Sequence, residues 1–257
     1  MSVSLLSIVI LTYNEVDTIT DCLESIKNWS DDIILIDHST DETVKIARNL
    51  IPKSKLRIVS DATQNDFSLL RNRGLVLARR EWVLFLDADE RVSNELRQEI
   101  DQAITLTSYA GYYLARRDFF LGKQLMHGET GNIHLLKLGK KNAGKWVRRV
   151  HEVWQINDQV GELNHPLEHR PHPTVAEFIA RVNRWTTLDA QEFYRAGKRS
   201  AWWKIILYPK AKFIINYFIK LGLLDGMPGL IMALVMSFHS FLTRAKLYLL
   251  QTNKQAV

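Results

Sequence analysis

The sequence predicts an α/β fold, in which a mostly parallel sheet carries helices on both faces and a helical appendage follows at the C-terminus. Up to about residue 104, short apolar runs alternate with segments of helical period, as in β-α-β units. One apolar run, Trp82–Leu86, is followed by two acidic residues, Asp87 and Asp89. This pattern is typical of a buried strand with polar residues at its C-terminal end. Residues 196–257 are both apolar and basic, which sets them apart from the rest.

The elements of the first half follow from apolar spacing and from capping residues. Four strands are expected at the apolar runs 7–11, 33–36, 56–59 and 82–87. Helices are expected where apolar residues recur at helical spacing, at 19–29, 44–50, 67–78 and 96–104. The second and fourth helices follow capping residues, Thr40–Asp41 and Ser93.

From about residue 111 the pattern changes to short strands separated by turns. These strands are expected at 111–116, 132–138, 147–156 and 162–169. A helix then begins behind Thr174 and Glu177, which have the spacing of a capping box. We therefore expect the second half to complete a pocket over the first.

Bulk composition indicates a globular protein of a reducing compartment. Charged residues make up 24% of the chain and hydrophobic residues 46%. Cys22 is the only cysteine in the sequence, so an internal disulfide is impossible. The apolar segment 1–11 has no basic stretch before it and no small-residue cleavage site after it, so we expect a first strand there and no signal peptide.

The C-terminal region concentrates positive charge around apolar segments. From Arg195 onward the sequence has ten basic residues and a single acid, Asp225. Two apolar segments, 213–224 and 229–242, are each about 12–14 residues long, which is less than the roughly 20 needed to cross a bilayer. With Trp202, Trp203, Tyr208 and Tyr217 beside the basic residues, the pattern favours helices lying in the headgroup zone of an anionic membrane over a nucleic-acid site. A helical pair packed on protein, or an oligomer interface, is the alternative.

Acidic and polar residues follow several of the predicted parallel strands. Asp87 and Asp89 end the fourth strand, Thr12 ends the first and Asp37 ends the second. Carboxyl ends of parallel strands share one sheet edge, where ligands bind in open α/β sheets. Two hard oxygen ligands there suit a divalent cation that holds a diphosphate, although an isolated Asp-x-Asp is more often an acidic turn because the pattern is short.

Taken together, the motifs resemble the family-2 glycosyltransferases of the GT-A fold, which is Rossmann-like. The similarity is strongest to the bacterial group that includes the lipopolysaccharide core β-glucosyltransferases. Where that group usually has a Trp-Tyr-Pro-like segment before an Arg-rich strand, this chain has Glu129–His134. The matching segments are Ser7–Glu15, Ile36–Thr43, Trp82–Arg91, Arg117–Gly122, Val150–Glu152, Leu221–Gly226 and Ala245–Leu247.

The resemblance implies a site for the donor nucleotide. Thr12, Tyr13, Glu15 and Asp37 would hold the nucleoside, and Asp37 would accept a hydrogen bond from the uracil N3–H. Asp87 would face the ribose. The same resemblance assigns a catalytic domain to residues 1–195, with a nucleotide-binding half at 1–110 and an acceptor half at 111–195, and a membrane-associating region to residues 196–257.

Further residues are implied around the diphosphate. Asp89 would ligate Mg²⁺ or Mn²⁺ between the two phosphates. His169 would supply another metal or phosphate contact, with an ordinary loop histidine as the alternative. Arg71 would reach the base or the diphosphate, unless it belongs to a solvated helix face with Arg73.

Glu152 is implied to be the general base for the acceptor hydroxyl. From the residues alone, a strand carboxylate beside cations such as Arg148 and Arg149 is more often part of a salt bridge. One base without a carboxylate nucleophile implies a single displacement with inversion.

The expected activity is hexose transfer, with glucose as the first candidate, from a UDP-sugar to a lipopolysaccharide core or another lipid-linked saccharide. The expected location is the cytoplasmic face of the inner membrane, as a peripheral or monotopic protein. A nucleic-acid partner is not expected, and an oligomer is left open. A polyprenyl-phosphate glycosyltransferase and a non-catalytic nucleotide-sugar-binding membrane scaffold are the alternatives.

Overall fold

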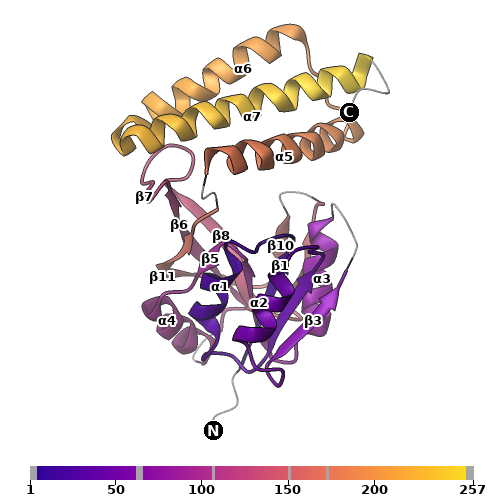
Figure 1. Ribbon diagram of the computed structural model, residues 1–257, viewed down its shortest axis with the longest axis vertical. Coiled ribbons are helices and arrows are strands. Elements are labelled where there is room, and N and C mark those ends of the chain that lie inside the picture. The colour runs from indigo at the N-terminus through magenta and orange to yellow at the C-terminus, as the bar shows by residue number, and fades with distance from the viewer. Residues whose placement is uncertain (1–4, 62–65, 106–107, 150–151, 172–173, 253–257) are drawn as a thin grey trace. The chain divides into compact units, whose positions relative to one another are not determined.

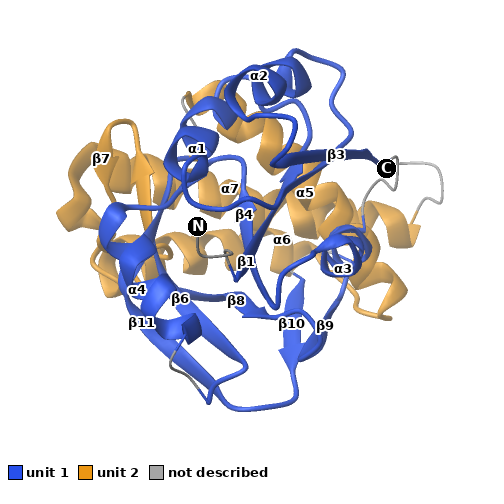
Figure 2. Ribbon diagram, turned by 90° about the horizontal axis from the view of Figure 1, so that it is seen from below, with its two compact units in different colours: residues 1–116, 133–170 blue, residues 117–132, 171–257 orange. Residues whose placement is uncertain are grey.

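The computed structural model describes residues 5–61, 66–105, 108–149, 152–171 and 174–252. The chain divides into two compact units (Figure 1, Figure 2). Unit 1 consists of residues 1–116 and 133–170, and unit 2 of residues 117–132 and 171–257. The functional division at residue 195 expected from the sequence stays a prediction.

The sheet of unit 1 is parallel on one side and mixed on the other. Its strands follow the order β3-β2-β1-β4-β8-β6-β11-β5. The first four are parallel, and β8 runs antiparallel to β4. The bounds are β1 (Leu6–Thr12), β2 (Ile33–Asp37), β3 (Leu56–Ser60), β4 (Trp82–Asp87), β5 (Glu90–Arg91), β6 (Gly111–Phe120), β8 (Ile133–Lys140) and β11 (Val160–His169).

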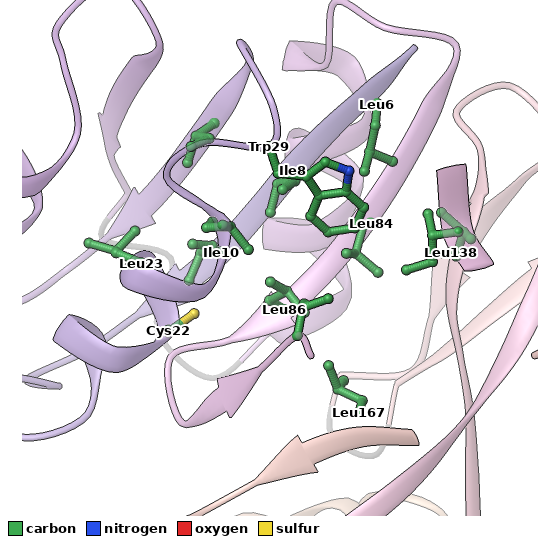
Figure 3. Close-up of a cluster of buried hydrophobic side chains, with 14 of the residues drawn as sticks. Leu6, Ile8, Ile10, Cys22, Leu23, Trp29, Leu84, Leu86, Leu138 and Leu167 are labelled. Atoms are coloured by element: carbon green, nitrogen blue, oxygen red, sulfur yellow. The ribbon is translucent and has the colours of Figure 1, made fainter. Parts of the chain in front are cut away.

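Helices cover both faces of this sheet, which confirms the predicted α/β class. One apolar cluster joins Ile8 and Ile10 of β1 to α1 (Ile19–Ile26), α2 (Thr43–Leu50) and α4 (Asn94–Thr105) (Figure 3). On the opposite face, Val9, Val83 and Phe85 pack with α3 (Phe67–Leu77). Because both faces are buried, the inner parallel strands β1, β2 and β4 are nearly continuous apolar runs, whereas β3 at the sheet edge contains Arg57 and Ser60.

A hairpin replaces the single strand expected over 147–156. The chain forms β9 (Gly144–Val147) and β10 (Val153–Ile156), which pair antiparallel. After β9, Arg148 adopts φ 71°, a left-handed conformation that arginine rarely adopts, and the sequence from 148 to 152 has no Gly, Pro or Asn to signal a break in the strand. Trp146 and Trp154 stack with ring centroids 5.4 Å apart, and both meet the Phe85 ring edge-on.

Unit 2 contains three long helices. They are α5 (Val175–Arg195), α6 (Trp202–Ile214) and α7 (Gly226–Thr252), with a π-helix η1 (Ile215–Ile219) and a 3₁₀ turn η2 (Gly222–Asp225) between the last two. As expected, Thr174 caps α5, where its hydroxyl accepts a hydrogen bond from the Glu177 N–H at 3.2 Å. β7 (Lys123–Gln124) pairs with the end of β6.

The apolar segment expected over 229–242 belongs to a longer helix. α7 has 27 residues because Arg244 and Lys246, which end the apolar run, are themselves good helix formers. Among the described residues, one helical stretch, Gly222–Thr252, is long and apolar enough to cross a membrane, and 33% of its apolar window is buried.

Candidate active site

The ends of β1 and β2 hold the Asp37 carboxylate in one orientation. Thr12 lies opposite Asp37 in the parallel register and donates from Oγ1 to Asp37 Oδ1 at 2.6 Å. Ser39 donates its hydroxyl to Oδ1 at 2.7 Å and its backbone N–H to Oδ2 at 3.0 Å. The side chain of Asp37 is therefore buried and oriented before any ligand arrives.

The loop after β1 places Tyr13 and Glu15 beside this carboxylate. Asn14 adopts φ 55° and accepts a hydrogen bond from the Thr40 N–H at 2.8 Å, which ties the loop to the turn after β2. The Tyr13 ring stacks on His38 at 5.9 Å and is 42% exposed, so one edge of an aromatic platform faces solvent. Glu15 accepts from the Thr18 hydroxyl at 2.8 Å.

A charged network surrounds Asp87 at the end of β4. Arg71 of α3 donates from Nη2 to Asp87 Oδ1 at 2.9 Å and from Nε to Glu152 Oε1 at 2.7 Å. Lys137 of β8 donates from Nζ to Asp87 Oδ2 at 2.7 Å and to Glu90 Oε1 at 2.6 Å. Glu90 also accepts from the Asp87 N–H at 2.8 Å. Two cations thus hold three carboxylates together.

The cations keep Asp87 ionised. Burial alone would raise the pKa of this carboxyl group, but Lys137 and Arg71 hold its pKa far below the usual range. Burial opposes the charge on Lys137 as well, yet Asp87 and Glu90 raise the pKa of its ammonium group. The Arg71 guanidinium also lies 4.8 Å from the centroid of the Trp146 ring. Burial and the neighbouring Asp87 raise the pKa of Glu90, although Lys137 opposes this shift, so the cations stabilise the charge on Asp87 in particular.

Glu152 and Asp87 are oriented by one guanidinium. Arg71 is 6% exposed, and its contacts in the described residues are with Asp87, Glu152 and the aromatic rings below it. A salt bridge of Glu152 is present, and its partner is Arg71 of α3. The structure therefore brings Arg71, Asp87 and Glu152 into one cluster, and their roles stay predictions.

Asp89 and His169 are far apart in the sequence but are brought together by the pairing of two strands. β5 pairs antiparallel with the end of β11, so that His169 lies opposite Glu90. His169 Nε2 is 3.6 Å from Asp89 Oδ1, and both side chains are nearly buried. The Arg170 N–H donates to the Asp89 carbonyl at 2.9 Å, which fixes the two segments.

This pair fits a cation that is shared with a ligand. In the described part of the chain, no group of three or more His, Cys, Asp or Glu side chains is arranged to hold a metal alone. A carboxylate oxygen and an imidazole nitrogen are nevertheless acceptable ligands for Mn²⁺, and Mg²⁺ is commonly bound through one or two carboxylates plus phosphates. Asp89 and His169 would thus supply the protein's share of the ligands, and a diphosphate the remainder.

Two residues of the network were not predicted from the sequence. Lys137 interrupts the apolar run Leu135–Leu138, and a lysine inside a buried strand requires an acidic partner. Glu90 follows Asp89 directly and reads as part of an acidic turn, yet its side chain is fully buried. Lys137, a charged residue within an apolar strand, was the feature of the sequence that could have indicated this buried network.

The fold and its acidic edge define a glycosyltransferase of the GT-A class. The family model of glycosyl transferase family 2 matches residues 7–206. The chain belongs to that family.

Individual relatives agree with this assignment. The lipopolysaccharide core biosynthesis glycosyltransferase LpsC of Rhizobium meliloti is 27% identical over 254 residues, covering 95% of this chain and 92% of LpsC. The uncharacterized glycosyltransferase RT0209 of Rickettsia typhi is 26% identical over 269 residues, covering 94% of this chain and 86% of that protein.

Two solved structures share the fold. S. aureus TarS 1–349 in complex with UDP-GlcNAc has a TM-score of 0.52 at 14% identity, covering 96% of this chain and 91% of that one. The mannosyltransferase PcManGT from Pyrobaculum calidifontis, in complex with GDP-Man and Mn²⁺, has a TM-score of 0.54 at 13% identity, covering 95% and 86%.

Proposed function

We propose that this enzyme transfers a hexose from a UDP-sugar to a saccharide of the lipopolysaccharide core, or to another lipid-linked saccharide, with inversion. Glucose is the first candidate for the hexose. The observation that carries the proposal is the pairing of Asp89 with His169 next to the ionised Asp87 network. The relation to LpsC, a lipopolysaccharide core biosynthesis enzyme by name, supports the acceptor class.

The donor nucleotide would bind at the carboxyl ends of β1, β2 and β4. Asp37 is held by Thr12 and Ser39 so that its carboxylate accepts from a base N–H. Tyr13 offers an exposed aromatic ring beside it, and Glu15 shapes the same loop. Asp87, at the neighbouring strand end, would face the ribose.

Asp89 and His169 would hold Mg²⁺ or Mn²⁺ against the diphosphate. The ion supplies charge neutralisation for the departing nucleotide. A metal-bound structural neighbour, PcManGT with Mn²⁺, supports this choice of cofactor.

Glu152 would accept the proton of the acceptor hydroxyl. As that oxygen forms its bond to the anomeric carbon, the bond from this carbon to the diphosphate oxygen breaks and the nucleotide leaves with the electron pair. Arg71 holds Glu152 in place by a bond at 2.7 Å. A single displacement of this kind inverts the anomeric configuration.

The enzyme would work at the cytoplasmic face of the inner membrane, where an amphiphilic acceptor resides. Residues 1–195 would carry the chemistry, and the basic, apolar residues 196–257 would associate with the anionic lipid surface. The concentration of Lys and Arg in this region supports the proposal.

The test is thermal stabilisation by UDP-glucose, UDP-galactose, UDP-N-acetylglucosamine, GDP-mannose and TDP-sugars, with and without Mn²⁺. A shift with one UDP-sugar that requires metal and is lost in Asp89→Ala is the expected result, with the exposed Asp158→Ala as matched control. No shift with any donor, together with no UDP release, would favour a non-catalytic scaffold. Transfer to a polyprenyl phosphate that persists in Glu152→Gln would favour the polyprenyl-phosphate enzyme, because a phosphate acceptor needs no base.

A further inference from the structure

Helix α6 and the π-helix η1 expose an unusual amount of apolar surface. α6 has no buried residue, although most of its side chains are apolar. Trp202 and Ile219, near the two ends of this segment, are each 69% exposed. Between them the exposed apolar side chains are Trp203, Ile206, Leu207, Tyr208, Ile214, Ile215 and Phe218. Soluble monomers rarely leave so large a contiguous patch bare.

Four of these exposed residues share one side of the segment. Trp203, Leu207, Ile214 and Phe218 follow each other at intervals of four, seven and four residues, which keeps them within one stripe at 3.6 residues per turn. The other side of the segment faces α7, where Ser237 donates its hydroxyl to the Pro209 carbonyl at 2.8 Å. Figure 1 shows α6 and η1 running along α7.

The charge on this segment is all of one sign. From Ala196 to Leu224 the sequence contains no acidic residue, while Lys204 is half-buried and Lys210 and Lys220 are exposed on the same segment. The Lys204 ammonium lies 5.4 Å from the centroid of the Trp203 ring. An apolar stripe bordered by lysines and tryptophans complements an anionic lipid headgroup layer more closely than a protein surface.

Helix α7, although long enough to cross a bilayer, is tied to a charged helix. Lys246 of α7 donates to Asn183 Oδ1 and Thr186 Oγ1 of α5, each at 2.8 Å, and Val235 packs with Val182. In Figure 1, α7 lies between α5 and α6. α5 carries six charged residues: Glu177, Arg181, Arg184, Asp189, Glu192 and Arg195. A spanning α7 would draw these charges into hydrocarbon, which is costly.

We propose that α6 and η1 lie in the plane of an anionic bilayer surface, with their exposed apolar side chains below the headgroups. α7 stays outside the hydrocarbon and supports them. This deepens the membrane association proposed above, because it assigns the lipid contact to α6 and η1 rather than to the helix that passes the length criterion.

The test uses the full chain with one added cysteine and an environment-sensitive fluorophore. Cys22 is fully buried, so the added cysteine is the one that reacts. Labels at Leu207→Cys and Phe218→Cys should shift to the blue and be quenched by shallow brominated lipids on vesicles of equal phosphatidylcholine and phosphatidylglycerol. The matched control is Ile179→Cys, an exposed apolar position on α5, which should show neither effect. Lys204→Gln and Lys210→Gln should each weaken partitioning roughly fivefold.

Three outcomes would overturn the proposal. Quenching of a Phe238→Cys label by lipids brominated deep in the acyl chains, with resistance to alkaline carbonate extraction, would make α7 a spanning helix. A blue shift at Leu207→Cys that depends on protein concentration without vesicles would make a second copy the occupant of the stripe. If neither label showed a blue shift or quenching on vesicles, α6 and η1 would not contact lipid. Metal-dependent stabilisation by the UDP-sugar, measured on the same labelled variants, reports separately on the proposed function.

Discussion

At the scale of single residues, the site depends on charges that hold one another in place. Glu152, Asp87 and Glu90 share two buried cations, Arg71 and Lys137. An unpaired charge in such a cluster is costly. The charge and orientation of each acidic or basic side chain in the site therefore depend on its partners. Conservative substitutions therefore test roles better than deletions do.

Replacement of Glu152 by Gln should lower turnover by about 10²–10⁴-fold, because the amide cannot accept the acceptor proton. The amide oxygen still accepts from Arg71, so donor affinity should remain unchanged. UDP release and calorimetric titration of the UDP-sugar measure the two effects. Glu162→Gln, which alters an exposed acid paired with His134, is the control. Turnover within a few-fold of wild type would contradict the general-base role.

The depressed pKa of Asp87 predicts a stability that depends on pH. In the folded state this carboxylate is ionised below its ordinary pKa of about 3.9, so its contribution is present above that pH and is lost as the pH falls. Asp87→Asn should therefore lower the free energy of unfolding at pH 7 by only about 1 kcal/mol, since the group is partly exposed and screened. The difference from wild type should shrink at pH 3. Urea unfolding at pH 7 and pH 3 measures the difference in unfolding free energy between wild type and Asp87→Asn. If this difference were the same at both pH values, the ion pairs would not be the source of the stability.

The limits of prediction are visible among these residues. Asp37, Asp87 and Asp89 were predictable because each ends, or directly follows, an apolar parallel strand. Lys137 was not predicted, and His169 was named only through the family resemblance, because they lie on strands β8 and β11, whose partners in the sheet the sequence does not specify. Their meeting with Asp87 and Asp89 depends on pairing between segments about 50 and 80 residues apart, beyond the reach of local periodicity.

At the scale of elements, the close approach of α3 to the sheet positions Arg71. Gly74, one turn beyond Arg71, faces β1 so closely that a Cβ atom there would lie 2.6 Å from Val9 Cγ1. Only glycine lets the helix lie this near the strand. The distance of α3 from the sheet in turn sets where the guanidinium meets Asp87.

Gly74→Ala should lower the free energy of unfolding by about 1–3 kcal/mol through overpacking. In an exposed helix the same change would stabilise the protein by up to about 1 kcal/mol. The sign of the change in unfolding free energy therefore distinguishes overpacking against β1 from an ordinary gain in helix propensity. Urea denaturation measures it, with Val76→Ala, at a position 83% exposed on the same helix, as control. A stabilised variant would show that α3 has room to move away from β1.

Parallel strands and their helices were predictable as elements, whereas the second half was less so. The runs 7–11, 33–36 and 82–87 are buried on both faces, which makes them unmistakable. The β9–β10 hairpin was predicted as one strand because its turn is built on arginine and carries none of the usual turn residues. The length of α7 was underestimated because the helix continues past the apolar run through Arg244, which bonds to Ser240 of α7, and Lys246, which bonds to Asn183 and Thr186 of α5.

At the scale of the whole molecule, Asp225 organises unit 2. Its buried carboxylate accepts from the N–H groups of Met126 at 3.1 Å and His127 at 2.9 Å, and lies 2.9 Å from His127 Nδ1. Lys123 donates to the Asp225 carbonyl at 2.8 Å. Glu129, in the segment that departs from the related group, pairs with Lys212 and Asn216.

Asp225→Ala should lower the free energy of unfolding of unit 2 by roughly 3 kcal/mol, because two backbone donors lose a charged acceptor. Limited proteolysis should then cut first within residues 123–129, and Asp158→Ala, an exposed acid of unit 1, should leave the pattern unchanged. Unaltered protease resistance in Asp225→Ala would mean that the segment holds its conformation without this carboxylate.

The Asp225 contacts also mean that residues 196–257 are not a detachable tail. Residues 123–129 precede their partners by about a hundred positions, so during synthesis they stay unbound until residues 212–225 have left the ribosome. A chain shortened at residue 195 would leave this segment permanently without its partners. Any loss of activity in such a chain would then report a misfolded loop as much as a lost membrane anchor, and substitutions within the full-length protein are the sounder way to separate the two.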